Sequence, residues 1–253
     1  MEQNLTVKIR SNKQIHTNYY HIVLDAPFIA RNAVPGQFVM VRGWRTTQPF
    51  FNRPFSIHRV RGENIEILYK VLGEATYQIS KLKRGDTMMV IGPLGNGFKI
   101  FKNCNTLLVA GGMGSAPLLF LSEILSKNSN SITLFIGAKT KGKLLCILDF
   151  KKIKNTVIPC TEDGSLGEKC FVTNNLKVFL KKNAPSVIYA CGPNAMLREV
   201  SKIADLKNIP CYISLETVMG CGIGTCLGCA IKTKKGTALV CKDGPVFNSK
   251  EIF

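Results

Sequence analysis

Four cysteines toward the C-terminal end constrain this chain more than any other feature of its sequence. Cys221, Cys226 and Cys229 fall within nine residues, and Cys241 follows after a longer gap. In this order of gaps, one loop can wrap a [2Fe-2S] cluster and supply three thiolates while a later turn brings the fourth. Glycines between the first three cysteines allow the tight turn that such a loop needs. The spacing therefore predicts an iron-sulfur cluster and, with it, electron transfer.

A structural zinc site is the main alternative explanation for four cysteines. Zinc modules usually present two short C-x2-C pairs on separate knuckles. Here three ligands crowd together and the fourth stands alone, which favours iron and sulfide. Zinc without iron or acid-labile sulfide in anaerobically purified protein would instead indicate a zinc-stapled basic binding module without redox activity.

Length and cysteine usage limit the class of protein. The 253 residues can form two domains of ordinary size, whereas the tail from Cys211 onward is too short for a large core. We expect that tail to fold around its metal. Ten cysteines could suit a secreted disulfide scaffold, but the stretch MEQNLTVKIR lacks the basic start and apolar core of a signal peptide. We therefore expect a reducing, cytoplasmic location.

One segment is long and apolar enough to raise the question of a membrane span. Residues 103–122 carry no charge, and about 20 apolar residues suffice to cross a bilayer. Three glycines and Pro117 interrupt its middle, however, and divide it into an apolar strand, a glycine turn and a helix. We expect this segment to be buried in the protein, without a membrane partner.

The net charge of +18 raises the question of nucleic-acid binding. Most of the charge comes from lysines that are spread singly or in pairs along the whole chain. No stripe of arginines and aromatic residues of the kind that stacks bases is present in the sequence. A solvated basic surface is therefore the favoured interpretation, and we expect no nucleic-acid partner.

Hydrophobic periodicity predicts a mixed fold of three domains. Alternating residues at 6–10, 37–42 and 65–71, with glycine and proline between them, indicate an N-terminal antiparallel β-barrel over residues 1–102. From Thr106, apolar strands alternate with helical stretches such as 194–205, which predicts a parallel sheet with helices on both faces. This α/β nucleotide domain would cover residues 103–210, and a small cluster domain would cover 211–253.

Two short motifs are compatible with phosphate binding. The turn from Gly111 to Pro117 follows an apolar strand and opens a helix, so its backbone can approach a pyrophosphate at a helix N-terminus. In the barrel half, Arg53 precedes Pro54 and can grip a phosphate bidentately, while the Ser56 hydroxyl points from the same strand face as Pro54. Taken singly, each motif could also be a packed turn or a surface arginine.

Five motifs follow one another along the chain: Arg53-Pro54-Phe55-Ser56, Gly73-Glu74-Ala75-Thr76, Gly92-Pro93-Leu94-Gly95, the Gly111 to Pro117 turn, and Cys191-Gly192-Pro193. Their order resembles that of the ferredoxin-NADP reductase superfamily. The four cysteines and the closing segment from Cys241 to Phe247 narrow the resemblance. The chain is then similar, over nearly its whole length, to the electron-transfer subunits of the two-subunit, NAD-linked dihydroorotate dehydrogenases.

This resemblance implies three cofactors and the residues that bind them. FAD would be bound by Arg53, Pro54, Phe55, Ser56, Gly73, Glu74, Ala75 and Thr76. NAD would be bound by Gly111, Gly112, Gly114, Cys191, Gly192 and Pro193. The [2Fe-2S] cluster would be bound by Cys221, Cys226, Cys229 and Cys241. Thr161 to Ser165 also looks like a family element, whereas Cys170 stands where the resemblance suggests glycine.

The resemblance also implies a partner and a direction for the electrons. They would pass from dihydroorotate through FMN in a separate catalytic subunit, then through the cluster and FAD to NAD, in pyrimidine biosynthesis. No catalytic residue is expected in this chain, because the proton of dihydroorotate would be removed in the partner. The complex would be a heterotetramer with two copies of each chain.

Two alternatives stay open at this level. A similar reductase subunit could serve a sulfhydrogenase or a ferredoxin-linked transhydrogenase, although the four intact cysteines argue mildly against relatives that replace one ligand with aspartate. The preferred nucleotide is also open, because Lys139, Lys141 and Lys143 stand where an acidic ribose ligand could be expected. The resemblance favours NAD.

The remaining cysteines and the histidines receive no role from the sequence. The cysteines at 104, 146, 160, 170 and 211 lie singly and are expected to behave as small buried hydrophobes. His16, His21 and His58 are scattered, and each is interpreted as a packed or exposed histidine.

Overall fold

The computed structural model describes residues 3–153 and 155–253 and divides the chain into two units. The first unit contains the N-terminal part up to Gly97 together with Glu216–Ile231 and Ala238–Pro245. The second contains Phe98–Leu215, Lys232–Thr237 and Val246–Phe253. The C-terminal segment is thus shared between the two units, and all four predicted cluster cysteines belong to the first. The division into three domains at residues 102 and 210 stays an interpretation.

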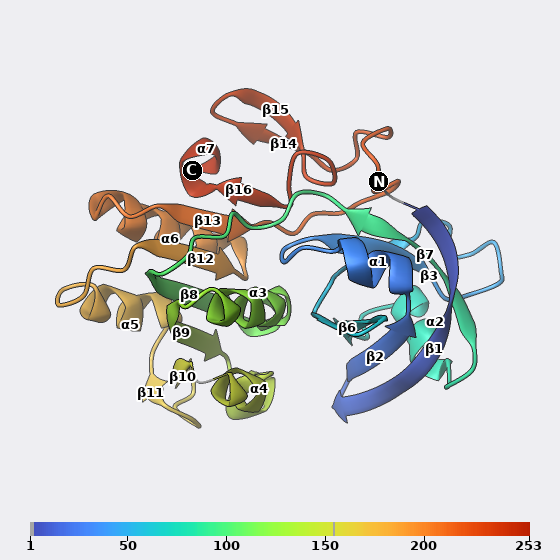
Figure 1. Cartoon of the computed structure of the whole chain (residues 1–253), viewed down its shortest axis with the longest axis horizontal. Coiled ribbons are helices and arrows are strands. Elements are labelled where there is room, and N and C mark those ends of the chain that lie inside the picture. The colour runs from blue at the N-terminus through green and yellow to red at the C-terminus, as the bar shows by residue number, and fades with distance from the viewer. Residues whose placement is uncertain (1–2, 154) are drawn as a thin grey trace. The chain divides into compact units, whose positions relative to one another are not determined.

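The first unit is built on a seven-stranded sheet in which every pairing is antiparallel (Figure 1). The order across the sheet is β4-β3-β7-β1-β2-β6-β5. The strands are β1 (Gln3–His16), β2 (Tyr19–Asp25), β3 (Phe38–Arg42), β4 (Arg53–Ser56), β5 (Arg59–Arg61), β6 (Asn64–Lys70) and β7 (Thr87–Leu94). The predicted antiparallel β-domain is confirmed, and its strands form an open half-barrel whose edge strands are β4 and β5.

Two short helices interrupt these strands and were not predicted. Helix α1 (Pro27–Asn32) starts at a proline, whose fixed φ suits the first helical turn. Helix α2 (Glu74–Lys81) follows Gly73 and buries Ala75 and Ile79. Both helices are too short for a clear 3.6-residue pattern, so their stability depends on tertiary packing rather than on propensity.

The second unit contains a seven-stranded, mainly parallel sheet in the order β11-β10-β9-β8-β12-β13-β16. Only the edge pair β13 and β16 is antiparallel among these strands. The strands are β8 (Asn105–Gly111), β9 (Ser131–Ala138), β10 (Thr156–Thr161), β11 (Glu168–Lys169), β12 (Val187–Cys191), β13 (Cys211–Ser214) and β16 (Val246–Asn248). A separate two-stranded sheet pairs β14 (Ala230–Thr233) with β15 (Gly236–Leu239).

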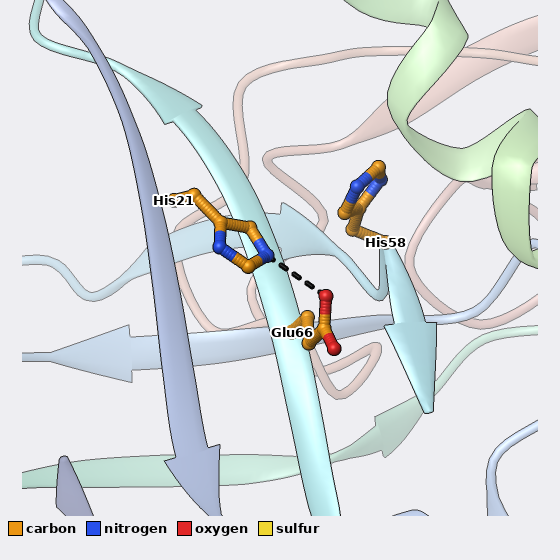
Figure 2. A group of neighbouring side chains, drawn as sticks. All are labelled: His21, His58 and Glu66. Carbon is orange, nitrogen blue, oxygen red and sulfur yellow. Dashed lines mark hydrogen bonds and ion pairs between the residues drawn. The ribbon is translucent and has the colours of Figure 1, made fainter. Parts of the chain in front are cut away.

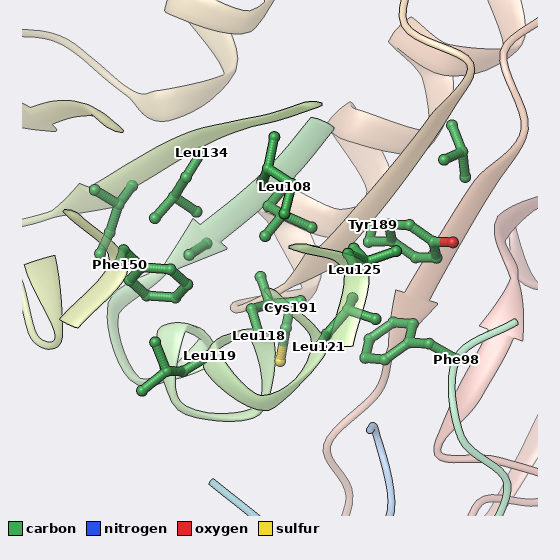
Figure 3. Close-up of a cluster of buried hydrophobic side chains, with 14 of the residues drawn as sticks. Phe98, Leu108, Leu118, Leu119, Leu121, Leu125, Leu134, Phe150, Tyr189 and Cys191 are labelled. Atoms are coloured by element: carbon green, nitrogen blue, oxygen red, sulfur yellow. The ribbon is translucent and has the colours of Figure 1, made fainter. Parts of the chain in front are cut away.

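Helices cover both faces of this sheet, as predicted. They are α3 (Ser115–Lys127), α4 (Ile147–Lys152), α5 (Val172–Phe179) and α6 (Asn194–Leu206), with α7 (Ser249–Ile252) near the C-terminus and short 3-10 turns η1 (Gly112–Gly114) and η2 (Lys141–Lys143). On one face, leucines of α3 and Phe150 of α4 pack on Leu108, Leu134 and Tyr189 (Figure 3). On the other face, α5 and α6 contact β9 and β12.

The charge-free segment 103–122 contributes to the interior of this second unit. It contains strand β8 and the first half of α3, in which Leu118, Leu119 and Leu121 are fully buried. This arrangement confirms the expected strand, glycine turn and helix. Within the described residues, no helix has the length and apolar character required to cross a membrane.

The sheet order places a topological switch point beside β8. The chain passes from β8 through α3 to β9 on one side, and it later inserts β12 on the other side of β8. In open α/β sheets, ligands bind at the carboxyl ends of the strands that flank such a point. The glycine turn after β8 and the Cys191-Gly192-Pro193 turn after β12 both lie at this edge.

Candidate functional site

The four predicted cluster cysteines come together in the first unit. The backbone N–H groups of Ile223 and Cys226 donate to Cys221 Sγ at 3.4 Å. The N–H of Cys241 donates to Cys229 Sγ, and that of Cys221 donates to Cys226 Sγ, again at 3.4 Å. N–H groups directed at cysteine sulfur are the contacts that orient and tune an iron-sulfur site. The loop therefore has the donor set and backbone arrangement that a cluster requires.

The cysteine thiols differ in burial and in ease of ionisation. Burial raises the pKa of Cys221, but hydrogen bonds from Thr225 and from the backbone N–H groups of Ile223 and Cys226 outweigh it and lower this pKa to about 5. Burial and the neighbouring Cys229 raise the pKa of Cys241 to about 12. Four adjacent thiols resist joint ionisation, and the positive charge of bound iron overcomes that resistance. The donor set thus fits a metal cluster.

Gly222 fixes the path of the cluster loop. Its φ is +78°, in the left-handed region, and a Cβ at this position would lie 2.4 Å from Cγ of Met40. Met40 is a fully buried residue of β3. Glycine is therefore required at this position for two reasons: the left-handed backbone conformation and the close approach of the loop to the sheet.

Asn96 ties the turn that carries the fourth cysteine to the end of β7. Its side-chain amide donates to the carbonyl oxygens of Lys242 at 3.1 Å and Asp243 at 3.0 Å. The Asn96 N–H donates to the Gly244 carbonyl at 2.6 Å. Asn96 could not be identified from the sequence, because the residues that its side chain contacts lie 146 and 147 positions away. The glycine-proline motif at 92–95 and the closing segment after Cys241 are thereby brought together.

The predicted FAD motif Arg53-Pro54-Phe55-Ser56 forms strand β4. Pairing of Val41 with Arg53 and of Phe38 with Ser56 shows a regular strand, so Arg53 and Phe55 share one face and Pro54 and Ser56 the other. The Arg53 guanidinium lies 5.9 Å from the Trp44 ring centroid, and its Nη1 donates to the Phe51 carbonyl at 2.5 Å. All four motif residues are half-buried, which leaves atoms accessible to a ligand.

The second predicted FAD motif begins helix α2. Gly73 and Glu74 are exposed at the helix N-terminus, whereas Ala75 and Thr76 are buried. The Thr76 hydroxyl accepts hydrogen bonds from the N–H groups of Leu72 and Gly73 and donates to the Gly73 carbonyl. Thr76 therefore shapes the turn, while the open N-terminal turn presents free backbone dipoles suited to phosphate. Direct contact of the Thr76 hydroxyl with phosphate stays a prediction.

The two turns of the predicted nucleotide site pack against each other. A Cβ on Gly114 would lie 2.0 Å from the Cys191 carbonyl oxygen, and one on Gly111 would lie 2.7 Å from Sδ of Met196. Gly112 has a φ of +54°, and nothing lies within 4 Å of its Cβ position. Gly114 is thus explained by packing between β8 and β12, and Gly112 is the glycine at which a ligand has open space.

The end of β9 lies beside the turn that follows β10. The N–H groups of Glu162 and Asp163 donate to the carbonyls of Ala138 and Lys139. The exposed Lys139 therefore lies next to two acidic residues. The Thr161 hydroxyl is bonded to the backbone of Leu166 in both directions at 3.0 Å, which closes the turn. This edge of the sheet thus carries charges of both signs.

Cys170 does not need a glycine backbone. The φ of Cys170 is not positive, so its backbone conformation is one that any residue adopts, and its N–H donates to the Thr161 carbonyl. Its thiol donates to Asn175 Oδ1 at 3.2 Å and contacts the thiol of the buried Cys160. The expectation that Cys160 and Cys170 lie singly was therefore wrong, because the return of the chain after β11 brings them together.

Comparison with solved structures defines the class of protein. A chain of the NADH-dependent reduced ferredoxin-NADP oxidoreductase, studied for flavin-based electron bifurcation, matches with a TM-score of 0.88 and 29% identity, covering 98% of this chain and 89% of that one. A ferredoxin NADP+ reductase from Neisseria gonorrhoeae with bound FAD and NADP shares the fold at a TM-score of 0.68 and 15% identity, covering 81% and 91%. The fold is that of the ferredoxin-NADP reductase class.

Sequence relatives identify the family within that class. The profile of the iron-sulfur cluster binding domain of dihydroorotate dehydrogenase B matches residues 216–253, and that of the oxidoreductase NAD-binding domain matches residues 108–202. The dihydroorotate dehydrogenase B (NAD(+)) electron transfer subunit of Clostridium acetobutylicum is 39% identical, over 100% of this chain and 98% of its own. The protein of that name from Desulforamulus reducens is 37% identical, over 89% and 87%. The chain belongs to the family of dihydroorotate dehydrogenase B electron transfer subunits.

Family membership agrees with the three predicted cofactors, FAD, a [2Fe-2S] cluster and NAD. It makes the chain an oxidoreductase component. In the first unit, the structure brings the four cysteines together and contains both predicted flavin motifs. In the second unit, it places the two turns at the switch point in contact. The residue assignments within each cofactor site stay predictions.

Proposed function

We propose that this chain carries electrons from the FMN of a dihydroorotate-oxidising catalytic subunit to NAD, in pyrimidine biosynthesis. The observation that carries the proposal is the combination of a complete four-cysteine cluster loop with full-length similarity to dihydroorotate dehydrogenase B electron transfer subunits. When bound, nicotinamide exchanges electrons in pairs, an iron-sulfur cluster exchanges them singly, and a flavin does both. This chain's own residues bind and orient the groups and exclude water.

Within this proposal, the residues divide the binding task. Arg53 binds the FAD pyrophosphate through its guanidinium, Ser56 lies near the isoalloxazine, and the α2 N-terminus at Gly73 binds phosphate. Gly112 lets the backbone approach the pyrophosphate of NAD, Gly114 holds that turn against the end of β12, and Cys191 to Pro193 border the nicotinamide. Cys221, Cys226, Cys229 and Cys241 bind the cluster. Glu162 and Asp163, beside Lys139, are consistent with NAD because acidic groups disfavour a 2′-phosphate.

The surface around the cluster loop supports docking of a protein partner. Cys226 is exposed. A Cβ at Gly220 would lie 3.2 Å from Cys226 Sγ and 3.5 Å from Cε1 of Phe51, so the Phe51 ring and the cluster loop meet at Gly220. Phe50, Phe51, Val218, Ile223 and Leu227 are all exposed apolar side chains of this unit. Phe50 and Phe51 pack edge to face and Phe51 lies beside Gly220, so these rings form an exposed apolar patch next to the cluster loop, of the kind that a protein partner covers. We propose that the FMN-containing catalytic subunit covers them, in a heterotetramer with two copies of each chain.

The state of the cysteines is consistent with a cytoplasmic location. All ten are free thiols, and six of them are not needed for the cluster. Proteins of oxidising compartments usually pair such residues in disulfides. We therefore propose that the chain works in a reducing compartment, the cytoplasm.

A second candidate function rests on the match to the NADH-dependent reduced ferredoxin-NADP oxidoreductase. That chain covers almost all of this one with a TM-score of 0.88. A ferredoxin-linked transhydrogenase subunit would use the same three cofactors with another partner. The two candidate functions use the same cofactor sites. The identity of the partner protein therefore distinguishes them.

Identification of the partner tests the proposal. The tagged chain is purified gently from its own host, and mass spectrometry identifies what co-elutes in stoichiometric amount. An FMN-binding dihydroorotate dehydrogenase supports the proposal. A larger ferredoxin-linked flavoenzyme or a hydrogenase as the stoichiometric partner would contradict it and leave the cofactor assignments intact.

A further inference from the structure

Two histidines and one glutamate converge on the sheet of the first unit, and none of the three belongs to a predicted cofactor motif, although His58 follows Ser56 by two residues (Figure 2). His21 lies on β2, Glu66 lies on β6, and His58 lies in the turn between β4 and β5. One ligand atom from each lies within 4.8 Å of the others. His21 Nε2 is 2.8 Å from Glu66 Oε2, and the two imidazole centroids are 5.8 Å apart.

The strand register brings these residues together from distant parts of the sequence. In the β2–β6 pair, Val23 lies opposite Glu66 and His21 lies opposite Leu68, so His21 and Glu66 are diagonal neighbours on one face. The backbone N–H of His58 donates to the Glu66 carbonyl at 2.9 Å, which sets its position beside them. Three separate segments therefore fix the three side chains.

The chemistry of the set is that of a transition-metal site. Imidazole nitrogen and carboxylate oxygen bind zinc at about 2.0–2.2 Å, and two histidines with one glutamate are a known three-ligand zinc set. His58 and Glu66 are 4% and 7% exposed, so part of the desolvation is already complete before an ion binds. The half-buried His21 leaves an opening for the ion and for a water ligand.

We propose that His21, His58 and Glu66 bind a divalent first-row transition metal, with zinc as the representative ion. Zinc would replace the His21–Glu66 hydrogen bond and take Oε2 of Glu66 and one nitrogen of each imidazole. Tetrahedral ligands at these bond lengths are about 3.4 Å apart. A pair of ligand atoms at the 4.8 Å limit must therefore approach by about 1.4 Å, which side-chain rotation can supply. The ion would link β2, β6 and the turn before β5.

Two arginines oppose the ion and limit its affinity. Nε of Arg61 lies 3.5 Å from Glu66 Oε1, the oxygen that His21 does not contact. Arg59 lies opposite Glu66 in the β5–β6 pair and adds a second positive charge. Because Arg61 is largely exposed, its repulsion is screened. Arg61→Gln should therefore tighten zinc binding by roughly two- to fivefold.

The histidine content of the chain provides a matched control. The sequence has three histidines, and the third, His16, is exposed at the end of β1. Zinc affinity is measured on the cofactor-loaded chain by competition with a chromophoric chelator. Flavin and iron contents are checked before and after, because empty cluster cysteines would also bind zinc. His21→Gln and His58→Gln should each weaken binding by at least about tenfold, and His16→Gln should leave it unchanged.

X-ray absorption at the zinc edge separates this site from any cysteine site. One bound zinc should show nitrogen and oxygen ligands at about 2.0–2.1 Å with imidazole scattering. Sulfur ligands at about 2.3 Å, or binding that survives both histidine substitutions, would overturn the proposal. The proposal would also be overturned if the wild-type chain, at a concentration above about 100 μM, bound no zinc from an equimolar solution. The three side chains would then form only the His21–Glu66 ion pair with its neighbours. Glu66→Gln provides a second variant if His58→Gln fails to fold.

Discussion

At the scale of single residues, Gly222 is the position at which the cluster loop tolerates least change. Gly222→Ala adds a Cβ 2.4 Å from Cγ of Met40 and forces alanine into a left-handed backbone. The two effects together cost about 2–4 kcal/mol. We expect iron and acid-labile sulfide contents to fall well below one cluster per chain. Gly228→Ala is the control, because among the described residues its Cβ position is near only Cys226 Sγ, at the ordinary contact distance of 3.5 Å, and its φ is not positive. Equal cluster contents in the two variants would contradict this account of the loop.

Arg53 is the residue on which the flavin assignment depends most. Arg53→Ala removes a charged hydrogen-bond donor to the proposed pyrophosphate, worth about 1.5–3 kcal/mol, so FAD should bind roughly 10- to 100-fold more weakly. Flavin content after gel filtration and the dissociation constant of re-added FAD measure the effect. Arg84→Ala, at an exposed turn before β7, should change neither. Full flavin retention in the Arg53 variant would remove this residue from the site.

At the scale of secondary-structure elements, the turns after β8 and β12 separate packing from binding. Gly114→Ala places a Cβ 2.0 Å from the Cys191 carbonyl, so it should destabilise the fold by about 3 kcal/mol and lower the melting temperature by several degrees. Gly112→Ala meets no atom within 4 Å and costs only the strain of a left-handed alanine, about 1–2 kcal/mol. It should therefore lower the melting temperature less, yet raise the KM for NADH by obstructing the backbone approach. Equal melting temperatures with equal KM values would refute this division.

Local patterns predicted some elements well and others poorly. Periodicity identified β6, α6 and the segment 103–122, because each has enough residues for its apolar pattern to repeat. The short helices α1 and α2 were missed because their stability comes from packing. The four cysteines that the structure brings together could be selected from the sequence because three of them lie within nine residues. Asn96, the Cys160–Cys170 contact and the His21–His58–Glu66 group could not, since each depends on register between distant segments.

At the scale of the whole molecule, partner binding should depend on the exposed aromatic ring beside the cluster loop. Phe51→Ser should weaken binding of the catalytic subunit by about tenfold or more while flavin and cluster contents stay normal, because aromatic anchors dominate interface energies. Ile15→Ser alters another exposed apolar residue of the same unit and should have little effect. Size-exclusion chromatography and titration of the two subunits measure both variants. Unchanged affinity in the Phe51 variant would locate the interface elsewhere.

The central claim is that this chain links dihydroorotate oxidation to NAD. The most direct test is anaerobic NADH formation by the chain combined with its host's FMN-containing dihydroorotate dehydrogenase subunit, followed at 340 nm. The account predicts dihydroorotate-dependent NADH formation that requires both chains. It further predicts that Gly222→Ala abolishes this activity while NADH still reduces the bound flavin. A fully loaded, stable complex that reduces flavin with NADH but forms no NADH from dihydroorotate would contradict the account.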